Sequence, residues 1–359
     1  MTQAPREVAE EVGQSQDITP TQRSDRAILP SFDNDEAAYQ AARSGVSLFD
    51  RSHWGRIRVS DDDRLRFLHN QTTYDFQSRQ PGDYCETVFV TSTAKTLDLV
   101  SAYVQADGVL LLTSPSQAQP LISWMDRYIF FADKVKLIDL TDKTIAFTAV
   151  GPQAQSCLEA LGWGAIASES NQHRNIAFNG VELTVSAETG LALPGFTVIG
   201  PADVGQSLWQ CLTEAGAVPA GETVWEWLRI EQGRPMPGQE LTEDYNPLEA
   251  GLWQTISFTK GCYIGQEIIA RLNTYKGVRQ RLWGLKSDRS LMANSPITLN
   301  GQKVGRVTSG IKTPADWRGL AYLRTKAGGA GLTVQIGETA ATVVELPFVR
   351  HQYWQGKTN

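Results

Sequence analysis

The alternation of apolar and polar side chains predicts several strands in the first half of the chain. Strands are expected over residues 55–60, 86–93 and 144–150. Residues 97–113 form a longer apolar stretch that contains Asp107-Gly108, and this dipeptide favours a tight hairpin turn. The stretch is therefore expected to form two antiparallel strands.

Apolar residues at helical spacing predict helices between these strands. They are expected over residues 121–131, 222–232 and 266–273. In the second helix Val224, Trp227 and Leu228 share one face, and Gly233 marks its end. This mixture of hairpins and helices is typical of an α+β fold.

From residue 281 onward, short strands alternate with turn residues, a pattern that predicts a small β-barrel. The expected strands cover residues 296–299, 303–308, 320–323, 332–336 and 341–346. The glycine-rich stretch 327–331 lies between two of them and is interpreted as a turn. The expected organisation is a disordered polar tail (1–30), an α/β module of two subdomains (31–280) and a C-terminal β-barrel domain (281–359).

Composition narrows the possible partners. The chain has 359 residues, of which 41% are hydrophobic, and a net charge of −6. That length and apolar content allow more than one core, and the negative charge argues against direct nucleic-acid binding. No apolar run approaches the ~20 residues of a membrane span. Residues 1–30 resemble neither a secretion signal nor a transit peptide, so the expected location is the cytoplasm.

The four cysteines are dispersed at positions 85, 157, 211 and 262, without metal-ligand spacing. This pattern fits a reducing compartment and predicts no permanent metal site. Cys262 differs from the others because Lys260 and two glycines surround it just ahead of the expected helix 266–273. A nearby cation and a helix start both favour a thiolate. The alternative is an unreactive cysteine in a turn.

The segment around Cys262 resembles the signature of the YgfZ family, K-G-C-Y-x-G-Q-E followed by an arginine. The matching residues are Lys260, Gly261, Cys262, Tyr263, Gly265, Gln266, Glu267 and Arg271. The family consists of folate-binding relatives of the glycine-cleavage aminomethyltransferase. The resemblance implies a GcvT-like fold of small domains around a central hole. It also implies a role in making or maintaining iron–sulfur clusters, including those of some tRNA-modifying enzymes.

The resemblance extends over nearly the whole chain beyond the tail. Segments that match the superfamily in order and spacing are 49–55, 67–72, 228–240, 247–252, 304–310 and 346–348. Two acidic positions of the transferases are not matched. A glutamate before a Gly-Phe pair is missing from the segment 191–196, and the aspartate pair aligns with Val100 and Ser101, with Asp98 nearby. These departures argue against standard aminomethyl transfer.

Trp54 and Trp225 match the tryptophans that are associated with folate contact in YgfZ-type proteins. Flat indoles suit a pterin or aminobenzoyl ring, and each offers one N–H donor. The alternative is that both are ordinary core residues. Trp227 lies on the same expected helix as Trp225, so the face that each residue occupies decides between them.

The roles of the other signature residues follow from their chemistry. Tyr263 and Gln266 are candidates to position a ligand by hydrogen bonding, while Glu267 and Arg271 are expected to pair along the helix. A dyad of Cys262 with His53 or His69 is possible if one of them folds close to the thiol, and the alternative is that both histidines are structural.

The sequence thus predicts a binding protein for tetrahydrofolate or a one-carbon derivative that assists iron–sulfur cluster assembly or repair. Its expected partners are cluster assembly proteins or client enzymes. Cys262 either supplies one ligand to a transient cluster shared with a partner or attacks a folate-borne one-carbon unit. The alternatives are a folate-dependent aminomethyl or methyl transferase that uses Cys262, and a scaffold without a ligand.

Overall fold

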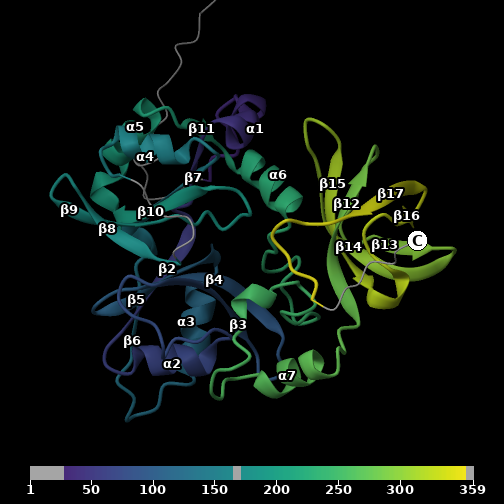
Figure 1. Cartoon of the computed structure of the whole chain (residues 1–359), viewed down its shortest axis with the longest axis horizontal. Coiled ribbons are helices and arrows are strands. Elements are labelled where there is room, and N and C mark those ends of the chain that lie inside the picture. Colours follow the sequence, from purple (N-terminus) through teal and green to yellow (C-terminus); the bar gives the residue numbers. More distant parts are fainter. Residues whose placement is uncertain (1–27, 165–170, 353–359) are drawn as a thin grey trace, which may run out of the picture.

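A computed structural model describes residues 28–164 and 171–352 of the chain. The expected tail, residues 1–30, lies outside the described residues except for positions 28–30. Figure 1 shows two sheets stacked one above the other, with a barrel beside them. Short 3-10 helices occur at Thr141–Lys143, Ala202–Val204, Trp253–Thr255 and Thr325–Ala327.

The upper sheet in Figure 1 has six strands in the order β11-β1-β7-β10-β9-β8. Their bounds are β1 Ser47–Asp50, β7 Thr144–Val150, β8 His173–Phe178, β9 Val181–Ser186, β10 Gly195–Pro201 and β11 Val218–Ala220. Helices α4 (Ala154–Ala160) and α5 (Gly205–Glu214) pack on this sheet, where Trp209 meets Phe147 edge-on at 5.1 Å between ring centroids. Apolar burial on this scale is the main force that holds the layers together.

The lower sheet has five strands in the order β3-β4-β5-β2-β6. The strands are β2 Trp54–Ser60, β3 Tyr84–Val90, β4 Thr96–Val104, β5 Gly108–Pro115 and β6 Lys136–Asp139. Helices α2 (Arg64–Gln71) and α3 (Ala118–Asp126) bury their apolar side chains against it. The predicted hairpin is confirmed as β4 and β5, which meet at Asp107-Gly108.

The C-terminal strands close into a six-stranded barrel in the order β12-β15-β14-β13-β16-β17. Their bounds are β12 Gln280–Ser287, β13 Pro296–Leu299, β14 Gln302–Lys312, β15 Trp317–Arg324, β16 Thr333–Ile336 and β17 Thr339–Val344. Strand β12 pairs with both β15 and β17, so no free edge remains between first and last strand. The expected α+β fold with a C-terminal barrel is confirmed.

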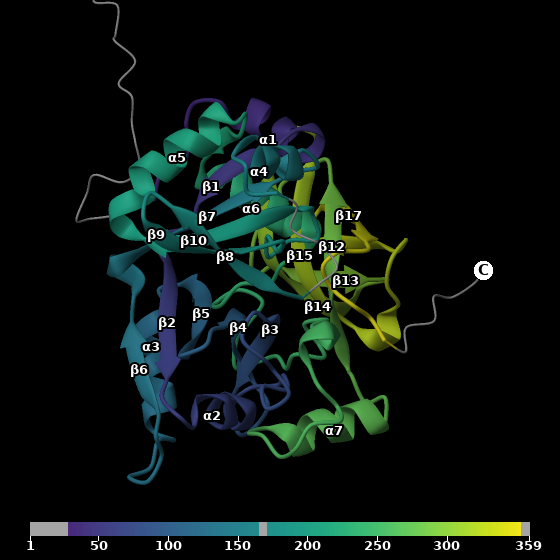
Figure 2. The ribbon, with the colours of Figure 1, turned by 60° about the vertical axis from the view of Figure 1, so that its left-hand side comes forward.

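Three further helices connect these parts. Helix α1 (Asp35–Ser44) and helix α6 (Glu222–Gln232) pack together near the six-stranded sheet, and α6 also reaches β14 and β15 of the barrel. Helix α7 (Gln266–Thr274) lies beside α2, at the end of the five-stranded sheet away from the six-stranded one (Figures 1 and 2). Helix α6 therefore lies between α1 and the barrel.

One helix expectation needs correction. The helix expected over residues 121–131 begins at Ala118 and ends at Asp126, because proline is tolerated in a first turn and Phe130 and Phe131 lie exposed beyond the helix. In α6 the fully buried tryptophan is Trp225, whereas Trp227 is only half-buried and packs edge-on against Tyr39. Trp227 packs against the same core as Val224 and Leu228, as expected, but Trp225 is the more deeply buried of the two tryptophans.

Candidate functional site

A small cavity lies between the two sheets and is lined by side chains from both of them and from α6. Its volume is about 10 Å³, room for roughly one water molecule. The lining residues that matter for its chemistry are Arg51, Trp54, Ser101, Tyr103, Glu188, Trp225 and Arg234. The two predicted folate-contacting tryptophans thus line one cavity.

Arg51 lies against both of these tryptophans. The indoles of Trp54 and Trp225 meet edge to face, 5.7 Å apart and at 89°. The Arg51 guanidinium carbon lies 4.1 Å from the Trp54 ring centroid and 3.7 Å from that of Trp225, so the cation interacts with both rings. Arg51 also donates a hydrogen bond of 3.0 Å to Glu222. Burial lowers the pKa of Arg51 to about 10, which still leaves it charged at neutral pH.

Several buried donors that belong to residues lining this cavity have no acceptor within the described part of the chain. They are Trp54 Nε1, Trp225 Nε1, Arg234 Nε and two nitrogens of Arg51, Nε and Nη2. A buried donor without a partner costs about 1–3 kcal/mol, and such groups are rare in native proteins. Donors gathered around one cavity therefore point to a ligand or solvent that carries acceptor atoms.

Two carboxyl groups, those of Glu188 and Glu86, lie near the positively charged arginines of the cavity. Glu188 lines the cavity, and Glu86 accepts a 3.1 Å hydrogen bond from Arg234 Nη1. Burial, and then the charge of Glu86, raise the pKa of Glu188 to about 7 from its usual 4.5. Glu188 was missed from the sequence. A charged residue two positions beyond the buried end of β9 was the signal available for it.

The structure also shows where the residues aligned with the missing aspartate pair lie. Ser101 faces the cavity, while Val100 packs in the core on the other side of β4. Asp98 lies on the Val100 side, where its carboxylate accepts hydrogen bonds from the backbone N–H and hydroxyl of Ser114. Burial raises the pKa of Asp98 to about 6. Asp98 therefore does not replace a cavity acid, whereas Glu188 provides one from another strand end.

The second candidate region is the loop that carries Cys262. Cys262 is exposed, whereas Cys85 and Cys157 are buried. The Lys260 ammonium donates to three backbone carbonyls around the end of α2, those of His69, Thr72 and Tyr74, at 2.5, 2.8 and 2.6 Å. These hydrogen bonds fix the loop to a part of the chain that is distant in sequence.

Lys260 therefore has a structural task besides any effect on the thiol. All three ammonium hydrogens have acceptors, and the ammonium lies 4.6 Å from the Tyr263 ring centroid. Burial lowers the pKa of Lys260 to about 7, and the charges that oppose this shift belong to Asp75 and Cys85. That Lys260 favours the Cys262 thiolate stays a prediction.

The remaining signature residues hold the turn before α7. Gly265 has a φ of 79°, and the side chain of Gln266 accepts a 3.4 Å hydrogen bond from the Tyr263 backbone. Tyr263 is buried, and burial raises its pKa to about 12. Glu267 and Arg271 lie on α7 without an ion pair between them in the described residues. Gln266 thus hydrogen-bonds within its own loop, and a ligand contact by Tyr263 or Gln266 stays a prediction.

The two histidines considered for a dyad lie in different places. His53 is near the cavity, 3.7 Å from Glu222, and burial lowers its pKa to about 3. His69 lies under the Cys262 loop, where Nδ1 is 3.0 Å from Asp75 Oδ1 and Nε2 faces Gly261. The structure therefore brings only His69 close to the signature loop.

The cavity and the Cys262 loop are separate regions. The residues that contact the loop come from α2, its following turn and the β3–β4 connection, and none of them lines the cavity. No group of three or more potential metal-ligating side chains occurs in residues 28–164 and 171–352. In the same ranges, no helix has the length and apolar character needed to cross a membrane.

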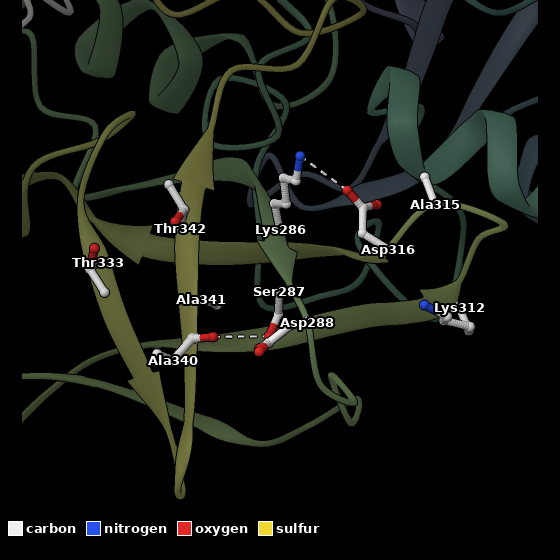
Figure 3. Close-up of a pocket in the computed structure, with 10 residues that line it drawn as sticks. All are labelled: Lys286, Ser287, Asp288, Lys312, Ala315, Asp316, Thr333, Ala340, Ala341 and Thr342. Atoms are coloured by element: carbon white, nitrogen blue, oxygen red, sulfur yellow. Dashed lines mark hydrogen bonds and ion pairs between the residues drawn. The ribbon is translucent and has the colours of Figure 1, made fainter.

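A larger cavity of about 420 Å³ opens on the barrel (Figure 3). Lys286 and Asp316 point toward each other across it with a 3.2 Å ion pair, and Ser287 donates to the Ala340 carbonyl. None of its lining side chains is a buried group without a partner in the described residues. Its polar groups therefore give no sign of a ligand.

Comparison with known proteins matches residues 22–260 to the model of the GCVT N-terminal domain. The chain belongs to this family. A chloroplastic protein of Arabidopsis thaliana, named a putative transferase, is 43% identical over 334 residues, covering 92% of this chain and 77% of that protein. An aminomethyltransferase of Picosynechococcus is 30% identical over 328 residues, covering 87% and 89%.

The fold agrees with this membership. The crystal structure of the glycine cleavage system aminomethyltransferase T from Bartonella henselae superposes with a TM-score of 0.77 at 21% identity, covering 89% of this chain and 91% of that one. At that identity the likeness shows the fold alone. The chain is therefore an aminomethyltransferase-like protein with the GCVT architecture.

Proposed function

We propose that this chain is a tetrahydrofolate-binding accessory protein for the assembly or repair of iron–sulfur clusters, with Cys262 as its reactive residue. The folate part rests on the buried donors without acceptors between Trp54 and Trp225. Family membership supports it, because relatives of similar length are named aminomethyltransferases.

The residues present fit a pterin in chemistry. A pterin edge carries both acceptor and donor atoms, and the cavity offers indole and guanidinium N–H groups together with the Glu188 carboxyl. Trp54 and Trp225 supply the flat apolar walls. The ring needs far more than about 10 Å³, so we expect the Arg51 side chain to move away from the two indoles when a folate binds.

The cluster part rests on the exposure of Cys262 and the fixed loop around it. In this proposal a cluster is cargo for this chain. An assembly protein or a client enzyme would present that cargo to the exposed thiol. None of the residues that contact the loop lines the cavity, and this separation favours the role over attack on a one-carbon unit within the cavity.

The test is a titration of tetrahydrofolate into the wild type and into the Trp54→Phe and Trp225→Phe variants, followed by calorimetry and melting temperature. Phenylalanine keeps an aromatic wall and removes the N–H donor. Each substitution is expected to weaken binding about fivefold, which corresponds to ~1 kcal/mol for one hydrogen bond. At 100 times Kd, folate should stabilise the wild type by about 2.7 kcal/mol.

Trp209→Phe is the matched control, because Trp209 is equally buried but lies in the core on the other side of the six-stranded sheet. It should bind as the wild type does. Absence of saturable binding in the wild type would remove folate from the proposal. In cells that depend on this chain, Cys262→Ser should bind folate normally and lose the support of iron–sulfur enzymes, and unchanged enzyme activity would contradict the cluster role.

A second candidate function is a folate-dependent aminomethyl or methyl transferase. It is favoured by Glu188, which places a carboxyl of raised pKa in the cavity although the aligned acids are missing. Turnover of a one-carbon folate by the purified chain, lost in Glu188→Gln, would support it. Tight folate binding without turnover would leave the accessory role.

A further inference from the structure

We propose that the exposed side of α7, together with the barrel end beside it, is a docking surface for an acidic protein partner. This rests on the proposed function, because a partner that exchanges a cluster with this chain must approach the exposed thiol of Cys262. The surface combines positive charge with an exposed aromatic ring, and we name it the basic surface. Its exposed members are Cys262, Arg271, Tyr275, Arg279, Arg324 and Lys326.

One small apolar cluster holds the thiol loop and α7 together. It contains Tyr263, which directly follows Cys262, and Ile269, the buried residue of α7. It also contains Val278, which directly precedes Arg279. The thiol, the exposed side of α7 and Arg279 therefore lie around one small core, at the end of the molecule away from the six-stranded sheet (Figures 1 and 2).

The barrel end is fixed to the same stretch of chain. The backbone N–H of Thr325 donates a hydrogen bond of 2.8 Å to the Arg279 carbonyl. The Thr325 hydroxyl donates one of 2.9 Å to the Val278 carbonyl. Arg324 and Lys326 flank Thr325 in the chain, and both are exposed. These hydrogen bonds therefore place two further cations beside Arg279.

The basic surface carries the opposite charge to the whole chain. The chain has a net charge of −6, yet residues 266–280 contain three basic residues and one acidic residue. Arg271, Arg279 and the two barrel cations take part in no ion pair among the described residues. Complementary charge on a partner speeds association and selects that partner over others. The cations of this surface therefore call for a partner with a negatively charged face.

Exposed aromatic rings accompany these charges on a fixed backbone. Tyr275 follows the end of α7 and is 78% exposed, while Phe258 on the thiol loop is 41% exposed. The backbone N–H of Tyr275 donates to the Arg271 carbonyl at 3.0 Å, and that of Gly277 donates to the Leu272 carbonyl at 2.8 Å. Tyrosine and arginine are enriched in protein interfaces, and a surface fixed in advance loses little conformational entropy on binding.

The charge pattern fits a folded protein better than a nucleic acid. Affinity for a nucleic acid comes from many phosphate contacts along an extended backbone. Here the cations occupy one end of a chain whose net charge is negative, so the rest of the surface repels a long polyanion. Glu267 also lies exposed in the first turn of α7. A compact acidic patch on another protein meets the cations without extending over the acidic remainder of the chain.

The test places the photo-crosslinking amino acid benzoylphenylalanine at Ala270, an exposed position of α7, in the full chain within cells that depend on it. Irradiation should join the chain to a protein, and mass spectrometry should find that the linked peptide carries net negative charge. Arg271→Glu and Arg279→Glu should each lower the crosslink yield about fivefold, since the reversed charges repel an acidic face. Lys303→Glu, an exposed cation near the start of β14, is the matched control and should leave the yield unchanged.

Three results would overturn the docking surface. They are an unchanged yield in both charge-reversal variants, a crosslink to RNA, and the absence of any crosslinked product. Capture of the same protein from Gln210, an exposed position of α5, would overturn it as well, because that helix lies on the six-stranded sheet.

Cys262→Ser separates this proposal from the proposed function, since crosslinking at Ala270 does not use the thiol. A crosslink that persists while iron–sulfur enzyme activity is unchanged in Cys262→Ser would contradict only the cluster role. Loss of enzyme activity in Cys262→Ser, without any crosslink from Ala270 in the wild type, would contradict only the docking surface. A crosslink that persists together with loss of enzyme activity supports both.

Discussion

At the scale of single residues, the cavity holds an acid whose ionisation the folded chain resists. The pKa of Glu188 rises to about 7 from 4.5, because the folded protein takes the carboxyl out of water and places Glu86 near it. Between these two values the folded state binds more protons than the unfolded state. Ionisation of Glu188 therefore reduces stability as the pH rises from 4.5 to 7.

We predict that Glu188→Gln stabilises the protein by about 1–3 kcal/mol at pH 8 relative to wild type and has little effect at pH 4.5. The neutral amide keeps the shape and removes the cost of ionisation. Urea denaturation at both pH values measures the difference. Glu214→Gln, at the exposed end of α5, is the control and should change neither value. An equal difference at both pH values would show that the effect does not come from ionisation of Glu188.

Only some of the cavity residues could be predicted from the sequence. Trp54 and Trp225 were found because a family resemblance assigned them, and the structure places their rings in contact. Arg51, Glu188 and Arg234 were not found. They lie in three different connections between elements, and each looks like an ordinary surface charge until the fold buries it. Sequence spacing cannot show that charges far apart along the chain share one cavity.

At the scale of elements, the turn between Cys262 and α7 depends on a glycine. Gly265 has a φ of +79°, and a Cβ there would lie 2.8 Å from the Thr91 carbonyl oxygen. Side chains rarely adopt this backbone conformation, and a backbone oxygen cannot move aside cheaply. The start of α7 is therefore held against the β3–β4 connection.

Gly265→Ala should destabilise the protein by about 2–4 kcal/mol and change the alkylation rate of Cys262, because strain and a steric clash act together. Gly216→Ala measures the backbone strain without the clash, since Gly216 has a φ of +98° with no atom within 4 Å of a built Cβ. It should cost only about 1 kcal/mol and leave Cys262 unaffected. Equal costs for the two variants, measured by denaturation, would show that the clash is relieved.

Periodicity predicted elements well where one face is buried and turn residues follow. Strand β7 and helix α6 have the expected bounds, and Gly233 ends α6 with a φ of 89°. Periodicity failed for β1 and β11, because short strands carry too few residues to show alternation. It also underestimated β14, whose polar outer residues continue beyond the apolar core to Lys312.

At the scale of the whole molecule, the cavity exists only when both sheets and α6 are assembled. Its walls come from positions between Arg51 and Arg234, and the hydrophobic core around it joins α1, both sheets and α6. The site therefore forms only in the complete tertiary structure, because no single element contains all of its residues. The fold class and barrel were predictable from pattern and resemblance, whereas the closed state of this cavity was not.

The position of Arg51 against both indoles has a consequence for the time course of binding. A ligand that needs the space now filled by the guanidinium must wait for that side chain to swing out, a motion that also breaks its 3.0 Å hydrogen bond to Glu222. In stopped-flow experiments the observed rate should then level off at high tetrahydrofolate concentration, at the opening frequency of the guanidinium. Glu222→Gln should raise that plateau, and a rate that rises linearly without limit would show that the cavity opens faster than ligand arrives.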